Sequence, residues 1–106
     1  MNTIATKHAY KRAKKRFSWN ASALDGMMDR AFHGGITHKD VKGQLNKYIC
    51  DLWLKHRFCN NVRIYGEDVY FFCDNRLITL YRLDNKLIKM IPKASKLNDS
   101  KTDIGY

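Results

Sequence analysis

The stretch NVRIYGEDVYFFCDNRLITLYRLDNKLIKMI, residues 61–91, decides the fold class of this chain. Apolar side chains recur in it at every second position, which is the spacing of a β-strand with one face in a core. Three polar segments interrupt this alternation and predict tight turns, at residues 66–68, 73–76 and 84–86. We therefore expect three or four short strands that form an antiparallel meander.

The residues before this stretch repeat with a helical spacing instead. A row of positions spaced four apart predicts a first helix over residues 4–17: Ala5, Ala9, Ala13 and Phe17. Residues 20–35 have the pattern of a second helix that ends at a pair of glycines, and residues 37–58 that of a third with one apolar stripe. Helices first and strands afterwards predict an α+β domain, with the N-terminal helices packed on one face of the sheet and the other face open.

The alternation assigns the strand residues to two faces of the sheet. The face that we assign to the helices is apolar: Val62, Ile64, Val69, Phe71, Cys73, Ile78 and Leu80. The face that we expect to be open carries aromatic rings, an Arg and a hydroxyl: Arg63, Tyr65, Tyr70, Phe72, Thr79 and Tyr81. Rings on an open sheet stack on unpaired bases and Arg binds phosphate, which predicts a nucleic-acid-binding surface of Arg63, Tyr65, Tyr70 and Phe72. The alternative is that the rings serve packing alone, and a register error of one residue would exchange the two faces.

The chain of 106 residues is strongly basic. Lys and Arg number 20 against 10 Asp and Glu, which gives a formal net charge of +10. A small domain with this charge attracts polyanions, so nucleic acid is the partner we expect first, RNA before DNA, and an acidic protein is the alternative. The length suits a single domain over residues 1–91, followed by a polar stretch, residues 92–106, that we expect to be a flexible tail.

Other classes of protein are disfavoured by what the sequence lacks. No apolar run is long enough to span a bilayer, and the first residues lack the apolar core of a signal peptide. We therefore expect no membrane partner and a cytoplasmic location, in a bacterial cell or a phage-infected host. Three cysteines without a secretion signal predict reduced thiols. No Cys pair has the spacing typical of zinc sites, so we expect neither a metal nor a cofactor.

The most basic segment is KHAYKRAKKRF, residues 7–17. On a helical projection, four lysines turn away from the alanine row and form a candidate nucleic-acid-binding face: Lys7, Lys11, Lys14 and Lys15. His8, Arg12 and Arg16 instead line the edge of that row, where the helix meets the rest of the fold. The alternatives are an ordinary solvated lysine face and, for His8, an ordinary half-exposed histidine. On the stripe of the third helix, His56 has the pattern of a hydrogen-bonded core histidine rather than a catalyst.

These residue types suit metal-independent cleavage of RNA. The reaction needs a base for the 2′-hydroxyl, cations for the charge around phosphorus, and an acid for the leaving 5′-oxygen. An imidazole titrates near neutral pH, so His8 suits proton transfer, and Arg12 and Arg16 suit phosphate binding. The residues that would approach the same phosphate from the sheet are Thr79, Tyr81 and Arg63.

The pattern H-A-x-x-R-x-x-x-R within HAYKRAKKR, residues 8–16, resembles the start of small bacterial and phage proteins that look like members of the barnase–EndoU–colicin–RelE superfamily of ribonuclease folds. Their last core strand is similar to LITLYRL, residues 77–83, so the resemblance covers roughly residues 7–83. It implies a small α+β fold with the active site on the open sheet face, metal-independent RNA cleavage, and often a toxin that an acidic antitoxin neutralises. Residues 18–57 form a longer connection than the short members have. The positions that match are His8, Arg12, Arg16, Thr79 and Tyr81.

Three functions therefore compete. A ribonuclease acting on RNA such as tRNA or ribosome-bound mRNA requires His8 and the Arg pair to converge with Thr79 and Tyr81. A non-catalytic nucleic-acid-binding protein, such as a phage accessory, host-takeover or anti-defence factor, requires only a continuous basic and aromatic surface. A module that docks on an acidic protein requires only the charge.

Overall fold

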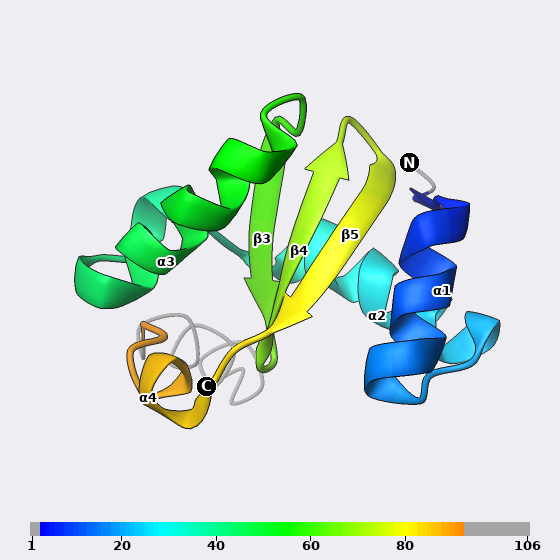
Figure 1. Cartoon of the computed structure of the whole chain (residues 1–106), viewed down its shortest axis with the longest axis horizontal. Helices are drawn as coiled ribbons and strands as arrows, with labels where there is room; N and C mark the ends of the chain where they lie inside the picture. The colour runs from blue at the N-terminus through cyan, green and yellow to red at the C-terminus, as the bar shows by residue number, and fades with distance from the viewer. Residues whose placement is uncertain (1–2, 93–106) are drawn as a thin grey trace, which may run out of the picture.

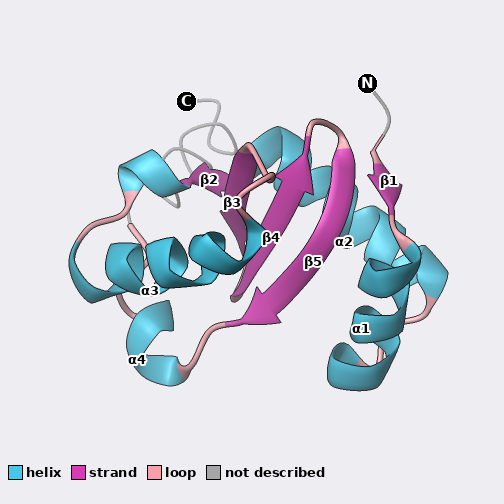
Figure 2. Ribbon diagram, turned by 45° about the horizontal axis from the view of Figure 1, so that its top comes forward, coloured by secondary structure: helices cyan, strands magenta, loops and turns pink. Residues whose placement is uncertain are grey.

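Three antiparallel strands form the centre of the sheet: β3 (Asn61–Tyr65), β4 (Asp68–Cys73) and β5 (Arg76–Arg82). The computed structural model describes residues 3–92. Two-residue strands extend the sheet at its edges, where β1 (Ile4–Ala5) runs parallel to β5 and β2 (Ile36–Thr37) antiparallel to β3 (Figure 2). The described sheet is thus five-stranded and mixed, in the order β1-β5-β4-β3-β2. The predicted meander is confirmed, but the prediction of a purely antiparallel sheet is wrong.

The helices differ from the predicted ones mainly at their ends. The first, α1 (Lys7–Phe17), begins after Thr6, whose side chain accepts a hydrogen bond from the backbone N–H of Ala9. The second, α2 (Ala21–Gly34), is capped in the same way by Asn20. The others are α3 (Gly43–Trp53), α4 (Asn85–Ile88) and two short 3₁₀ segments, η1 (His38–Asp40) and η2 (Leu54–His56).

Two local features explain these departures. Gly43 has a φ of 66°, a left-handed conformation that divides the predicted third helix into η1 and α3. The optional fourth strand is a single helical turn, α4, because the Asp84 side chain accepts a hydrogen bond from the N–H of Leu87. Each departure is thus set at a single residue, by the backbone conformation of Gly43 in one case and by the side chain of Asp84 in the other.

Helices cover both faces of the sheet, so the expected open face is wrong. Figure 1 shows α2 passing behind the central strands, α3 and α4 on the viewer's side, and α1 beside β5. Leu24, Met28 and Ala31 of α2 form one buried cluster with Tyr70 and Phe72. A second buried cluster joins α3 and α4 to the opposite face: Leu45, Ile49, Val62, Ile64, Val69, Phe71, Leu83 and Leu87.

A β-bulge at Ile78 decides which side chains of β5 face α3. Phe71 pairs with Thr79, but Phe72 pairs with Leu77, so Ile78 is an extra residue in the ladder. Beyond the bulge the alternation is reversed, which places Thr79 and Tyr81 on the α3 face, beside the pairing partners Phe71 and Val69. The predicted face set is therefore split: its β5 members face α3, whereas its β3 and β4 members face α2.

Beyond the end of β1, the edge of β5 forms hydrogen bonds with Thr6 and with the first helix. The backbone N–H of Thr6 donates to the carbonyl of Leu77, and its hydroxyl donates to the carbonyl of Ile78. Further along the helix, Nε of Arg12 donates to the carbonyl of Leu80 at 2.7 Å. The small, buried side chains of Ala9 and Ala13 let the helix approach closely. These hydrogen bonds fix the basic helix against the strand that carries Tyr81.

The predicted polar tail, residues 92–106, lies outside the described residues except for Pro92. Over residues 3–92, none of the helices has both the length and the apolar composition that crossing a membrane requires.

Candidate functional site

Tyr81 is the centre of a cluster of polar side chains that come from α1, η2 and β5. The guanidinium of Arg12 lies over the Tyr81 ring, 4.4 Å from its centroid. On the other side, the Tyr81 hydroxyl lies 2.8 Å from Nε2 of His56. All three side chains are partly buried. We call Arg12, Tyr81 and His56 the Tyr81 cluster.

The surroundings of His56 favour its neutral form over its protonated form. Its pKa is lowered, first by burial and then by the positive charges of His8, Lys55 and Arg12. The ring packs near Phe71, with centroids 5.6 Å apart. When the proton is on Nδ1, Nε2 accepts the hydroxyl proton of Tyr81. The cluster therefore contains a proton acceptor beside a cation.

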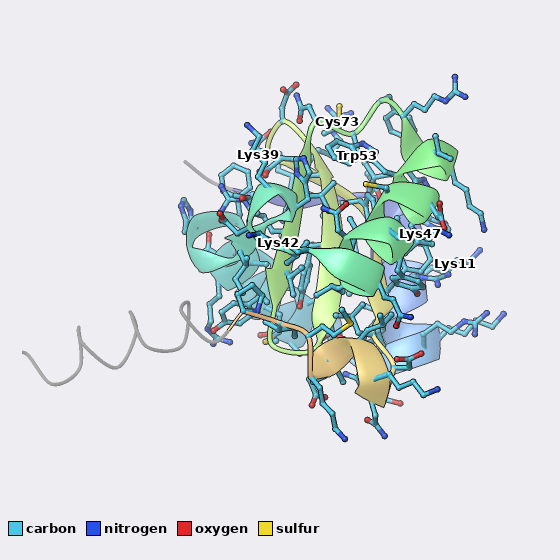
Figure 3. All side chains as sticks on the ribbon, turned by 90° about the vertical axis from the view of Figure 1, so that its left-hand side faces the viewer. Lys11, Lys39, Lys42, Lys47, Trp53 and Cys73 are labelled. Carbon is cyan, nitrogen blue, oxygen red and sulfur yellow. The ribbon has the colours of Figure 1, made fainter. Side chains whose placement is uncertain are left out.

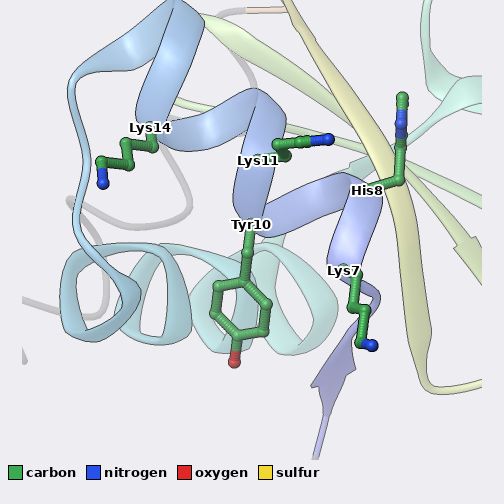
Figure 4. Close-up of a pocket in the computed structure, with 5 residues that line it drawn as sticks. All are labelled: Lys7, His8, Tyr10, Lys11 and Lys14. Atoms are coloured by element: carbon green, nitrogen blue, oxygen red, sulfur yellow. The ribbon is translucent and has the colours of Figure 1, made fainter.

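His8 lies at the outer rim of this cluster. It is exposed, and its charge is one of those that lower the His56 pKa. Figure 4 shows His8 and Lys11 projecting from one side of α1 and Lys14 from the other. A shallow hollow of about 210 Å³ lies along the first of these sides, lined by His8, Lys11, Arg12, Lys15 and Arg16.

Comparisons with known proteins give this chain no relative. Models of protein families, curated proteins and solved structures were each searched, and none matches.

Of the five residues predicted as catalytic, the structure brings two into direct contact. Arg12 and Tyr81 touch, and His8 lies at their rim. Arg16 is exposed and lines the same hollow. Thr79 faces the same side of the sheet as Tyr81 but is completely buried, and its hydroxyl has no hydrogen-bond partner. A side chain in that position cannot touch a ligand, so the prediction for Thr79 is wrong.

The stacking surface predicted on the sheet is wrong as well. Tyr70 and Phe72 are fully buried, and the Phe72 ring packs edge-on against Phe32 of α2 at 5.1 Å. Tyr65 packs against the buried cluster that Tyr70 and Phe72 form with α2. Arg63 is tied down by hydrogen bonds to the carbonyl of Gly35 and the side chain of Asn61. The four predicted residues lie on the sheet face opposite Tyr81, where the three aromatic residues pack against the α2 side and Arg63 is hydrogen-bonded.

The lysine face of α1 is exposed, as the helical projection predicts: Lys7, Lys11, Lys14 and Lys15 are all at the surface. Lys11 and Lys15 line the same hollow as His8. Two of the four lysines therefore lie beside Arg12 of the Tyr81 cluster.

Sequence reasoning missed His56 as a member of the site. The expectation of a hydrogen-bonded histidine is confirmed, but its partner is Tyr81, a predicted site residue. Tyr48 lies on the same stripe of the third helix, and burial raises its pKa, with Asp84 and Tyr81 adding to the rise. The signal was present in the third helix, whose apolar stripe contains these two polar side chains and nothing else that titrates.

The described residues contain no group of three or more His, Cys, Asp or Glu that could hold a metal ion. Cys59 is buried, and burial raises the pKa of its thiol to about 11.

Proposed function

We propose that the protein binds single-stranded RNA along α1 and cleaves the strand at the Tyr81 cluster without a metal ion. The observation that carries this proposal is that Arg12 contacts the ring of Tyr81 and His56 its hydroxyl, although α1, η2 and β5 are far apart in sequence. The exposed His8 and the lysine face lie beside them. Base, cation, acid and polyanion-binding surface are thus adjacent.

The roles follow from the protonation and position of each group. His56, whose pKa is lowered, takes the proton of the Tyr81 hydroxyl as the tyrosine oxygen takes the proton of the RNA 2′-hydroxyl. The 2′-oxygen forms a bond to phosphorus, the bond to the 5′-oxygen breaks, and His8 supplies the proton to that leaving oxygen. The products are a 2′,3′-cyclic phosphate and a 5′-hydroxyl.

Arg12 suits the charge that develops on the phosphate oxygens. Its hydrogen bond to Leu80 uses Nε, one of the five N–H groups of a guanidinium. Its guanidinium lies over the Tyr81 ring, so it adds a positive charge next to the tyrosine. Lys11 and Lys15, in the same hollow, suit the neighbouring phosphates.

A second function is favoured by the same contact. Arg12 joins α1 to β5 through Leu80 and Tyr81, so the cluster would also serve to hold the helix on the strand, with no catalytic role. In that case the lysine face binds RNA and nothing is cleaved. An acidic protein that covers this face would then act as an inhibitor of binding rather than of catalysis.

The test is incubation of purified protein with unstructured RNA in EDTA, followed by gel analysis. We expect defined fragments from the wild type and a loss of about a hundredfold or more in rate for His8→Ala and Tyr81→Phe. His33→Ala removes an exposed histidine of α2 and serves as the matched control, with unchanged cleavage. DNA of the same sequence should be bound but not cleaved, because it lacks the 2′-hydroxyl.

Retardation of the RNA without cleavage by the wild type would establish the binding function and refute the catalytic one. Equal cleavage by the wild type and Tyr81→Phe would refute the assignment of the Tyr81 cluster.

A further inference from the structure

The hollow beside the Tyr81 cluster is the first of three that adjoin one another around α1. It shares His8 and Lys11 with a second, of about 590 Å³. The second shares Tyr10 and Lys14 with a third, also about 590 Å³, that reaches the start of α2. Figure 4 shows the residues that line the second hollow. The three hollows are therefore neighbours around α1, with shared side chains between them.

The third hollow differs from the others because two aromatic rings line it. Trp19 is partly exposed and packs on Phe17, with ring centroids 4.8 Å apart. The hydroxyl of Tyr10 donates a 2.8 Å hydrogen bond to Asp25, which ties its ring to α2. Both rings are therefore held in place before any ligand binds. The hollow also falls within the range of about 300–1,000 Å³ that is typical of small-ligand sites.

The charges around this hollow select an anionic ligand. Lys14 lies on its rim, and Lys7 and Lys11 line the hollow next to it. Asp25, which accepts the hydrogen bond of Tyr10, is not among the residues that line this hollow. A ligand with a flat apolar part for the rings and a phosphate for the lysines fits this combination, and a nucleotide of a single strand has both.

We propose that the Tyr10–Trp19 hollow binds an unpaired base of the same RNA strand, some nucleotides away from the bond that is cleaved. This inference rests on the proposed RNA binding and adds a second subsite to it. A base inside a duplex is paired and stacked and cannot enter the hollow. The protein should therefore prefer single-stranded RNA to duplex RNA, and strands that reach Trp19 to shorter ones.

The test uses an unstructured, labelled RNA of about 12 nucleotides and fluorescence anisotropy. We expect Trp19→Ala to weaken binding about tenfold, whereas Phe58→Ala should leave it unchanged. Phe58 is a matched control because it is an exposed aromatic residue, with 61% of its surface accessible, and lines none of the three hollows.

Because Trp19 packs on Phe17, its replacement can disturb the fold, so a second measurement keeps the native residue. In a Trp53→Phe protein, Trp19 is the remaining tryptophan of the chain. We expect its fluorescence to be quenched when single-stranded RNA binds and to stay constant when duplex RNA is added.

The outcomes separate the two proposals. If the wild type and Trp19→Ala bind RNA with equal affinity and the fluorescence of Trp19 is not quenched, the base subsite is overturned and the proposed function still stands. No RNA binding by the wild type would overturn both. Equal quenching by a polyglutamate peptide would also overturn the subsite, because it would show an acidic-protein surface instead.

Discussion

The guanidinium of Arg12 lies 4.4 Å from the centre of the Tyr81 ring, and its Nε donates to the carbonyl of Leu80, the residue before Tyr81. One side chain of α1 therefore holds two neighbouring residues of β5. A guanidinium over a ring adds cation–π attraction to the hydrogen bond. This arrangement couples the position of the basic helix to the position of the candidate catalytic tyrosine.

Replacing Arg12 should reduce stability. Arg12→Ala removes the hydrogen bond to Leu80 and the cation–π attraction to Tyr81, so we expect the free energy of unfolding in urea to fall by about 1–3 kcal/mol. Arg16→Ala is the control, because Arg16 is exposed on the same helix and its replacement should change stability by no more than about 0.5 kcal/mol. Equal effects of the two substitutions would show that the contacts of Arg12 do not stabilise the attachment of α1 to β5.

Stability should fall in mildly acidic solution, partly because of His56. Its lowered pKa means that the unfolded chain takes up a proton at a higher pH than the folded protein does. The contribution of neutral His56 is thus complete above the ordinary value of 6.5 and decreases as the pH falls below it. His38 has a pKa lowered by burial as well and adds to the same decrease.

Thermal melts between about pH 7.5 and pH 5 measure this decrease. His56→Gln keeps a hydrogen-bonding partner for Tyr81 but does not titrate, so its stability should depend less on pH than that of the wild type. An unchanged pH dependence would show that His56 is not held neutral.

Removing the hydroxyl of Thr79 should stabilise the protein. The hydroxyl is buried without a partner, which costs about 1–3 kcal/mol of desolvation. Thr79→Val has nearly the same shape, so we expect a gain of about 1 kcal/mol in the free energy of unfolding and no change in RNA cleavage. Abolished cleavage in a stable Thr79→Val protein would restore Thr79 as a catalytic residue.

Reversing charge on α1 should weaken RNA binding, and reversing it on the α3 side should not. We compare Lys11→Glu, Lys14→Glu and Lys15→Glu in one protein with the same change at three lysines around α3, labelled in Figure 3: Lys39, Lys42 and Lys47. Both proteins have the same net charge. For the α1 variant, the slope of log affinity against log salt should become shallower by about 0.7 for each phosphate that is no longer neutralised. Equal weakening in both would indicate attraction by overall charge alone.

The main elements of the fold follow from the sequence, because α1 and α2 carry several repeats of a helical period and polar turns separate the three long strands. The two-residue strands β1 and β2 are too short to carry a period. One signal in the sequence did indicate that helices cover both faces of the sheet. Four consecutive residues of β4 are apolar or aromatic, a pattern typical of a strand buried on both faces: Val69, Tyr70, Phe71 and Phe72.

The candidate site was predictable in part. Arg12 and Tyr81 were chosen for their chemistry, and they do meet. The face of Tyr81 was assigned wrongly, because a single extra residue at Ile78 reverses the alternation and leaves no mark in the sequence. His56 could not be placed, since its partner lies 25 positions away and depends on how α3 crosses the sheet.

The attachment of α1 to β5 has a consequence for solubility. An uncovered strand edge presents N–H and carbonyl groups that pair with other chains and start aggregation. Thr6 and Arg12 occupy the carbonyls of Leu77, Ile78 and Leu80, so this edge offers no template to a second molecule. The opposite edge ends in only two residues, Ile36 and Thr37. The basic helix therefore protects the sheet from self-association. A chain that lacks the residues before Phe17 should form oligomers even where its core survives.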